Sequence, residues 1–169
     1  VYNSSGYEKP ETIRLLKGYV DIYLPDLKYF SSELSGKYSK AEDYFEIASC
    51  AIKLMIEQTG APVFDSDGML QKGVIVRHLV LPNCRKDSIS LLHWLKETLP
   101  DKHYLISLLS QYTPFYNSHK YPELNRRITT YEYESILKEA ISLGLVEGFM
   151  QEKSSAKEEY TPPFDLEGL

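Results

Sequence analysis

Short apolar runs and helical patterns alternate along nearly the whole chain, and this alternation constrains the fold more than any other feature. Apolar and β-branched runs predict strands that end near Asn3 and that span 19–24, 73–81, 103–109 and 145–150. Between them, apolar residues at helical spacing predict four helices. Because strands that alternate with helices form right-handed βαβ units, we expect an α/β fold with one parallel sheet.

Capping and terminating residues set the expected bounds of these four helices. The helices are expected over 10–17, from a capping box at Ser39 and Glu42 to Gly60, from Asp87 to Pro100, and from a second capping box at Thr129 and Glu132 to Leu143. The stretch 61–72 fits neither a helix nor a strand. Asp65 there resembles the start of a calcium loop, but Val76 stands at the twelfth position, so we expect a plain turn.

The length of the chain favours part of a barrel over a closed one. The chain has 169 residues, whereas a closed eight-stranded β/α barrel needs about 250. About five strands and four helices predict a partial parallel (β/α) barrel that lacks its N-terminal strands, in one domain over 1–151. The polar stretch 152–169 is expected to run along the surface as a tail. The start at Val1, without Met, favours an excised or incomplete chain.

Charge and cysteine content exclude several classes of protein. The formal net charge is -5, and no cluster of Lys and Arg indicates a nucleic-acid partner. No apolar run reaches the roughly 18 residues of a membrane span, and the first residues lack the basic and then apolar pattern of a signal peptide, so a cytoplasmic protein is expected. Cys50 and Cys84 are too few for a disulfide framework or a three-cysteine cluster, and we expect both to be reduced structural thiols.

Polar residues follow several predicted strands at their carboxyl ends, where parallel β/α proteins carry their sites. Asp26 and Lys28 stand just after a strand, and both long strand-to-helix loops, 25–38 and 110–129, lie at this end. Together the two side chains could hold a polar ligand. The alternative is a solvated turn with a weak surface ion pair.

Two further pairs of residues are candidates at the same end. Arg77 and His78 are neighbours on a strand, so they point to opposite faces, and one should face the barrel interior. The alternative is a structural ion pair and a core histidine. Gln111 and Tyr112 could hydrogen-bond a ligand, unless the tyrosines only pin their own loop.

Four segments taken together, in this order and spacing, resemble the later strands of radical S-adenosylmethionine enzymes, in the branch of pyruvate formate-lyase activating enzyme. The segments are Asn-Ser-Ser-Gly-Tyr at 3–7, Val-Asp-Ile-Tyr-Leu-Pro-Asp-Leu-Lys at 20–28, Val-Arg-His-Leu-Val-Leu-Pro at 76–82, and Gln-Tyr-Thr-Pro at 111–114. The resemblance covers about 1–150.

The resemblance implies a partial barrel that holds a [4Fe-4S] cluster on a C-x3-C-x2-C loop after its first strand. S-adenosylmethionine binds the open iron, and its reductive cleavage yields a 5′-deoxyadenosyl radical that abstracts hydrogen. In activating enzymes the hydrogen comes from a glycine in a partner protein, and an electron donor supplies the electron for the cleavage. The cluster ligands would precede Val1, so this chain alone is expected to be inactive and to hold no metal.

The resemblance also implies a set of residues that border the cofactor. They are Asn3 and Ser4 at a strand end, Asp26 and Lys28 in an Asp-x-Lys motif, Arg77 with its neighbour His78 on the following strand, and Gln111 or Tyr112. Some relatives carry Asp in place of Asn3. The well-known activating enzymes carry a His near the cofactor at the place where this chain has Gln111 or Tyr112.

Two other functions remain open from the sequence. One is a non-catalytic binding or assembly module that retains half a barrel. The other is a different α/β barrel enzyme, such as an aldolase, although a Schiff-base lysine is expected inside a strand and Lys28 lies beyond one. Because half a barrel leaves an open sheet edge, we also expect the chain to associate with itself or with another chain.

Overall fold

The computed structural model describes residues 1–146 and 148–150 and contains a parallel sheet with its helices. The strands are β1 (Tyr2–Ser4), β2 (Ile22–Pro25), β3 (Val63–Phe64), β4 (Leu70–Leu79), β5 (Leu105–Leu109) and β6 (Gly148–Met150). The helices are α1 (Pro10–Leu15), α2 (Ser32–Ser39), α3 (Tyr44–Thr59), α4 (Arg85–Thr98) and α5 (Thr130–Ser142), with a 3-10 turn, η1, at Tyr116–Lys120. The predicted tail over 152–169 lies outside the described residues.

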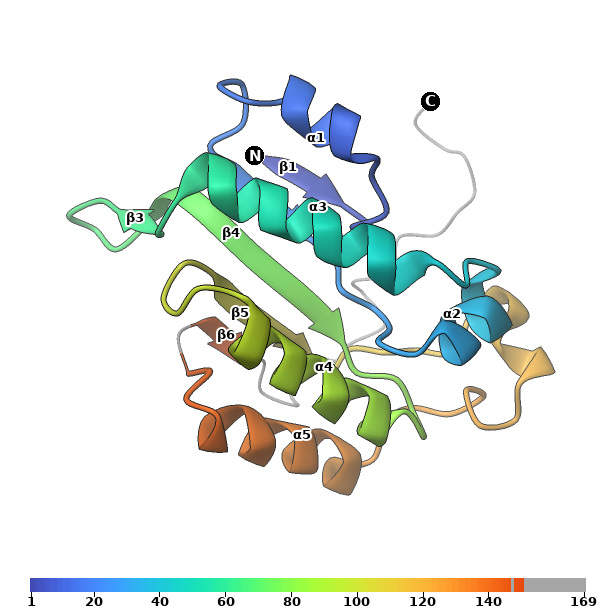
Figure 1. Ribbon diagram of the computed structural model, residues 1–169. Coiled ribbons are helices and arrows are strands. Elements are labelled where there is room, and N and C mark those ends of the chain that lie inside the picture. The colour runs from blue at the N-terminus through green and yellow to red at the C-terminus, as the bar shows by residue number, and fades with distance from the viewer. Residues whose placement is uncertain (147, 151–169) are drawn as a thin grey trace, which may run out of the picture.

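Five strands form the parallel sheet in the order β1-β2-β4-β5-β6, and β3 pairs antiparallel with β4. Each parallel step along this order is joined through at least one helix, as Figure 1 shows. The predicted α/β class and the alternation of strands and helices are therefore confirmed, and the arrangement is consistent with a partial (β/α) barrel.

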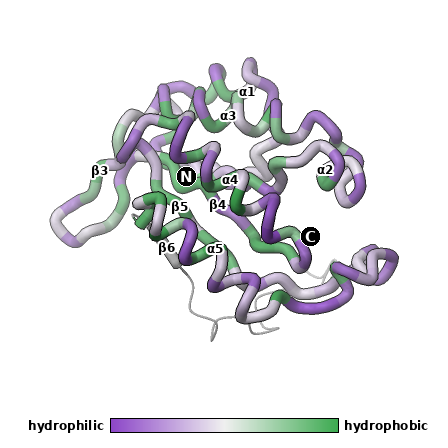
Figure 2. The backbone as a smooth tube through the Cα atoms, turned by 60° about the horizontal axis from the view of Figure 1, so that its bottom comes forward, coloured by the Kyte–Doolittle hydropathy of each residue, from purple (hydrophilic) through white to green (hydrophobic). Residues whose placement is uncertain are grey.

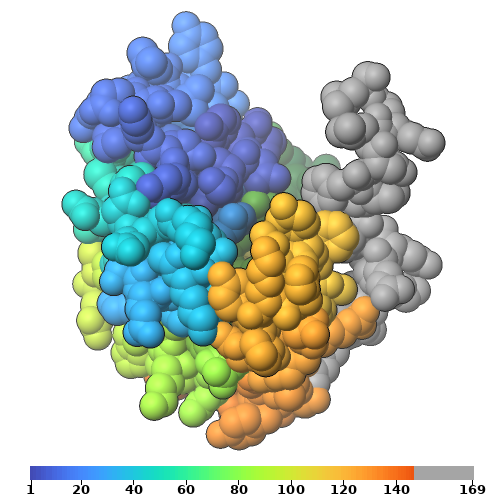
Figure 3. Space-filling model, turned by 90° about the vertical axis from the view of Figure 1, so that its right-hand side faces the viewer, coloured from blue at the N-terminus to red at the C-terminus, as the bar shows by residue number. Residues whose placement is uncertain are grey.

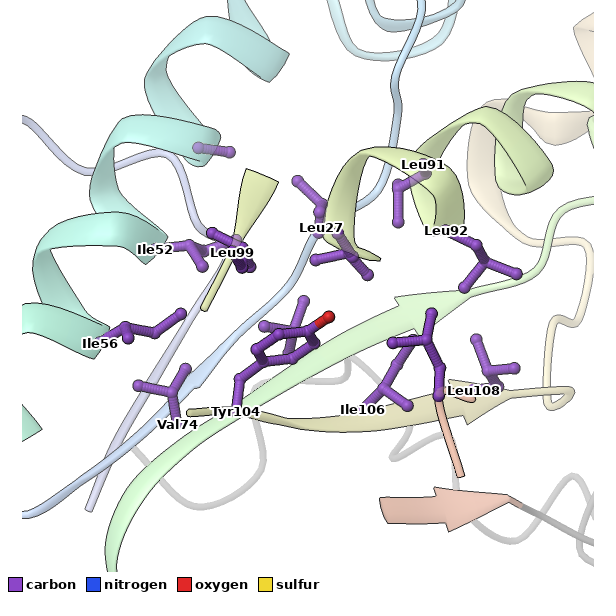
Figure 4. Close-up of a cluster of buried hydrophobic side chains, with 14 of the residues drawn as sticks. Leu27, Ile52, Ile56, Val74, Leu91, Leu92, Leu99, Tyr104, Ile106 and Leu108 are labelled. Atoms are coloured by element: carbon purple, nitrogen blue, oxygen red, sulfur yellow. The ribbon is translucent and has the colours of Figure 1, made fainter. Parts of the chain in front are cut away.

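The helices α1, α3, α4 and α5 cover one face of the sheet, and the core lies between them and the strands (Figure 1). Alternate strand residues point into this layer and are almost fully buried, among them Tyr23, Val74, Val76, Ile106 and Leu108. Leu27, Leu91 and Leu92 close the core from the loop after β2 and from α4 (Figure 4). Burying one such side chain contributes about 1.5–3 kcal/mol, so this layer supplies most of the driving force for folding.

The opposite face of the sheet is less covered along β2 and β4. Leu24, Ile75 and Leu79 alternate with the core residues and are only half-buried. This face corresponds to the inside of a barrel. Figure 2 shows apolar strands in the centre and a hydrophilic turn between β3 and β4.

Helix α2 was not expected, and the predicted capping box at Ser39 and Glu42 is wrong. Helix α2 occupies the second half of the predicted loop 25–38 and ends at Ser39. The Ser31 hydroxyl caps its start by accepting from Leu34 N at 3.4 Å. Lys40 follows the helix in the left-handed conformation, and α3 begins after Asp43, which makes no side-chain cap bond. The second predicted box is confirmed: Thr129 and Glu132 cap the start of α5 reciprocally.

The prediction that Asp87 caps α4 is wrong, because Asp87 lies inside the first turn of that helix. Its two carboxylate oxygens accept hydrogen bonds from Phe30 N at 2.9 Å and from Ser31 N at 2.7 Å. The carboxylate thereby ties α4 to the loop after β2. A local capping pattern could not reveal this role, because both donors are more than fifty residues away in sequence.

The stretch 61–72 forms a β-hairpin. Strand β3 pairs with the first residues of β4, so β4 begins at Leu70, before the predicted start of that strand. The turn between them is the plain turn that we expected: Asp65 Oδ1 accepts from the backbone N of Asp67 and of Met69 at 3.0 and 2.9 Å.

The two cysteines lie in different environments. Cys84 is buried, and burial raises the pKa of its thiol to about 11. Cys50 is exposed on α3, so the expectation that both thiols are structural is wrong for Cys50.

His78 belongs to the core, which corrects its assignment to the cofactor site. Its side chain is 1% exposed and points to the helical face of the sheet. Nδ1 lies 2.7 Å from Leu27 O, which can only accept, so Nδ1 carries the proton. Nε2 then accepts from Ser88 Oγ at 2.9 Å. Both ring nitrogens are thus satisfied, one by the loop after β2 and the other by α4, with the imidazole neutral.

Acid should destabilise the fold through His78. Burial lowers the pKa of His78, whereas an unfolded histidine titrates near pH 6.5. The unfolded state therefore binds more protons below about pH 6.5. The contribution of neutral His78 to the free energy of unfolding is complete above that pH and is lost as the pH falls, by up to about 1.4 kcal/mol per pH unit. Urea unfolding at pH 8 and pH 5.5 measures this loss. His78→Gln removes the titration, so its stability should fall less between the two pH values; an equal fall in both proteins contradicts the prediction.

Candidate functional site

Three strand ends meet at Arg77. Asp26 directly follows β2 and is the register partner of Arg77 on β4. One guanidinium nitrogen, Nη2, donates to Asn3 Oδ1 and to Asp26 Oδ1, each at 2.6 Å. Leu27 N also donates to Arg77 O at 2.8 Å, which continues the pairing beyond the end of β2. The side chains of β1, β2 and β4 are therefore joined on the face opposite the helices.

Lys28 completes a cluster of mixed charge. Its Nζ lies 3.5 Å from Asp26 Oδ2, so Asp26 stands between an ammonium and a guanidinium. The Asp26 and Arg77 side chains are 24% and 26% exposed, which screens this pair less than a surface ion pair. Arg77 Nε is buried and has no hydrogen-bond partner in the described part of the chain. Because this N–H group has no acceptor, the site fits a ligand that brings an acceptor oxygen.

The turn after β1 packs directly on Asp26. Ser4 O accepts from Asp26 N at 3.0 Å, and Ser4 Oγ accepts from Gly6 N at 3.2 Å. Gly6 has φ +79°, and a Cβ on it would lie 2.2 Å from Asp26 O. The close approach of two backbones therefore requires glycine here.

Glu8 is a member of this region that the sequence analysis missed. Ser4 Oγ donates to Glu8 Oε2 at 3.1 Å. Burial raises the pKa of Glu8, and the nearby charge of Asp26 acts in the same direction. The signal was an acidic residue in the short turn between a strand end and Pro10, but a turn of this length gives no hint of burial.

The loop after β5 lies beside α2 at the same end of the sheet. Figure 3 looks onto this end, where the first residues, α2 and the loop lie side by side. Tyr121 donates to Lys37 O at 2.8 Å, and Tyr38 donates to Glu123 Oε1 at 2.8 Å. Lys37 pairs with the same carboxylate, and its hydrogen bond lowers the pKa of Glu123 to about 2. The two predicted long loops are thus held together.

Gln111 and Tyr112 begin this loop. The Tyr112 hydroxyl donates to Leu124 O at 2.9 Å, so it pins its own loop, and Gln111 is exposed. Ser110 Oγ, just before them, is buried without a hydrogen-bond partner among the described residues. A role of Gln111 and Tyr112 toward a ligand stays a prediction.

The cluster can bind a polar ligand of mixed charge. An ammonium and a guanidinium can receive a carboxylate, and carboxylate oxygens can receive an ammonium or hydroxyl groups. The amino-acid end of S-adenosylmethionine carries such groups, so the residues present fit it.

An iron–sulfur cluster does not fit the described residues. Cys50 is exposed on α3, and Cys84 is buried before α4. Within 1–146 and 148–150, no three His, Cys, Asp or Glu side chains lie together so that they could hold a metal ion.

Among the described residues, no helix combines the length and the apolar character that a membrane span requires.

Comparison with known proteins supports the fold. No protein-family model matches the chain. The chain is 34% identical over 140 residues to an uncharacterized protein of Methanocaldococcus jannaschii, a match that covers 81% of this chain and 36% of the relative. The chain thus spans about a third of that protein's length. A crystal structure of a domain of pyruvate-formate lyase-activating enzyme from Bacteroides vulgatus is similar, with a TM-score of 0.60 and 14% identity over 90% of this chain and 82% of that domain. At this identity the likeness shows a shared fold.

Substitution of Gly6 should destabilise the protein more than substitution of a second glycine with the same backbone conformation. Gly6→Ala brings both the strain of a positive φ and a clash with Asp26 O, with an expected loss of about 2–4 kcal/mol in the free energy of unfolding. Gly18 has φ +84°, but a Cβ there meets no atom within 4 Å among the described residues, so Gly18→Ala should cost about 1 kcal/mol. Urea unfolding of both variants measures the difference, and equal losses would show that the turn and Asp26 do not pack as described.

Proposed function

We propose that this chain is the C-terminal part of a radical S-adenosylmethionine enzyme barrel of the activating type. One observation carries the proposal: Arg77 joins Asn3 and Asp26 at the carboxyl ends of three parallel strands, with Lys28 beside them. These positions are the ones for which the sequence resemblance implies contact with the cofactor. The shared fold with a domain of an activating enzyme supports the same assignment.

The residues of the cluster have separate roles in this proposal. Arg77 and Lys28 supply positive charge for the carboxylate of the ligand, with Arg77 Nε as a further donor. Asp26 orients both cations and accepts from the ligand's polar groups. At a [4Fe-4S] cluster that other residues of the whole protein would hold, S-adenosylmethionine would be cleaved with one electron from the reductant and would supply hydrogen-abstraction chemistry.

The substrate and the partners of the whole protein stay predictions. They comprise a glycine-bearing protein as hydrogen donor, an electron donor, and association of this chain through its open sheet edge. Cytoplasmic location also stays a prediction. Proteins that share a fold often differ in their substrates and partners, so the shared fold does not identify those of this protein.

Cleavage of S-adenosylmethionine tests the proposed function directly. The whole protein that contains this chain is expressed anaerobically and reconstituted with iron and sulfide. Under reductant it should form 5′-deoxyadenosine, measured by chromatography. No product from a protein whose cluster is loaded would remove the enzyme assignment and favour a non-catalytic binding module.

Neutral variants of the cluster should need more S-adenosylmethionine for the same rate. We expect Asp26→Asn and Lys28→Gln each to raise the KM for S-adenosylmethionine at least about tenfold, because each removes a charge from a partly buried cluster. Asp101→Asn is the matched control: it removes a carboxylate paired with Lys96 at 3.0 Å near the amino end of β5. Its KM should stay unchanged. The same KM in all four proteins would show that the cluster does not bind this cofactor.

A further inference from the structure

Tyr44 lies behind the candidate site and contacts two of its loops through one oxygen. It is the first residue of α3 and is 4% exposed. Its hydroxyl lies 2.9 Å from Ser5 O in the turn after β1 and 3.0 Å from Asp26 O after β2, and both oxygens can only accept. The same oxygen accepts from Lys28 N at 3.1 Å.

The ring of Tyr44 is held from both sides. Tyr7 stacks on it with the ring centroids 5.9 Å apart and an angle of 17° between the planes. Tyr29 packs against it edge to face at 5.6 Å. Tyr7 is also tied to α3, since its hydroxyl donates to Asp43 Oδ1 at 2.6 Å. The hydroxyl of Tyr44 is therefore presented to the two loops at a defined place.

The hydroxyl of Tyr44 remains a donor over the whole physiological range. Burial raises the pKa of Tyr44 above its ordinary value, so the proton stays on the oxygen. A phenolic oxygen with one proton and free lone pairs can serve one donor and share its proton between two nearby acceptors. No aliphatic side chain at this position could do both.

We propose that Tyr44 is a positioning residue of the candidate site: its hydroxyl fixes the turn after β1 against the end of β2 and so places Asp26 and Lys28 for the ligand. The proposal rests on the proposed function for the identity of that ligand. The sequence resemblance assigns no role to Tyr44, which lies on α3, away from all four matching segments.

Removal of the hydroxyl leaves the ring packing in place but breaks this link. In Tyr44→Phe, Lys28 N loses its acceptor, and the carbonyls of Ser5 and Asp26 lose their shared donor. Asp26 and Lys28 should then hold their positions less tightly. Binding must then re-order Asp26 and Lys28, and a re-ordering cost comparable to one hydrogen bond corresponds to about a tenfold loss of affinity for S-adenosylmethionine.

Tyr29→Phe is the matched control. Tyr29 is 7% exposed and belongs to the same aromatic cluster, and its hydroxyl bonds to Ser39 Oγ at the end of α2 at 3.0 Å, not to the backbone of Ser5, Asp26 or Lys28. Both variants remove one buried tyrosine hydroxyl. A merely structural effect should therefore be similar in the two.

The test compares wild type, Tyr44→Phe and Tyr29→Phe in the whole, cluster-loaded protein, well below the melting temperature. One readout is the dissociation constant for S-adenosylmethionine. The other is hydrogen–deuterium exchange at the Lys28 amide, with the Leu27 amide, which donates to Arg77 O, as internal reference. We expect about tenfold weaker binding and faster Lys28 exchange in Tyr44→Phe alone.

Equal affinity in wild type and Tyr44→Phe, or equal losses in both variants, would overturn the positioning role. If the wild type does not bind S-adenosylmethionine, the proposed function fails, and the exchange measurement decides the role of Tyr44 by itself. Lys28 exchange that rises only in Tyr44→Phe then supports the role, and unchanged exchange refutes it.

Discussion

The hydrogen bonds from Arg77 to Asn3 and Asp26 are the interaction on which the rest of this site depends. They join the side chains of three parallel strands, and they form only because Asp26 is the register partner of Arg77. A charged group that is only about a quarter exposed needs such partners, since an unpaired buried charge is costly. The same contacts that satisfy Arg77 gather the polar groups of the candidate site in one place.

The alternation of side chains along β4 separates this site from the core. Arg77 faces the open side of the sheet, while its neighbour His78 faces the helices and bonds to Leu27 O and Ser88 Oγ. A shift of one residue in register would exchange the two environments, placing a guanidinium in the apolar layer. The packing of the core therefore also determines which polar residue a ligand can reach.

The elements that the sequence missed or misplaced share a physical cause. Asp87 bonds to backbone groups more than fifty residues away in sequence, and the two-residue strand β3 is too short to give a period. Tyr112 donates within its own loop, a choice that depends on where Leu124 lies. Local patterns report local bonds, so roles that depend on distant partners escape them.

The sequence alone determined the α/β class, the alternation of strands and helices, and the position of Asp26 and Lys28 just after a strand, because periodicity and strand direction are local properties. That Arg77 belongs with them was implied only by the family resemblance. Only the tertiary structure decided that Asn3 is the third partner of Arg77, that His78 is a core residue, and that Tyr44 on α3 reaches both loops. These contacts join residues that are between 10 and 74 positions apart. Which residues meet depends on strand register and helix packing, and no short segment of the chain determines either of these.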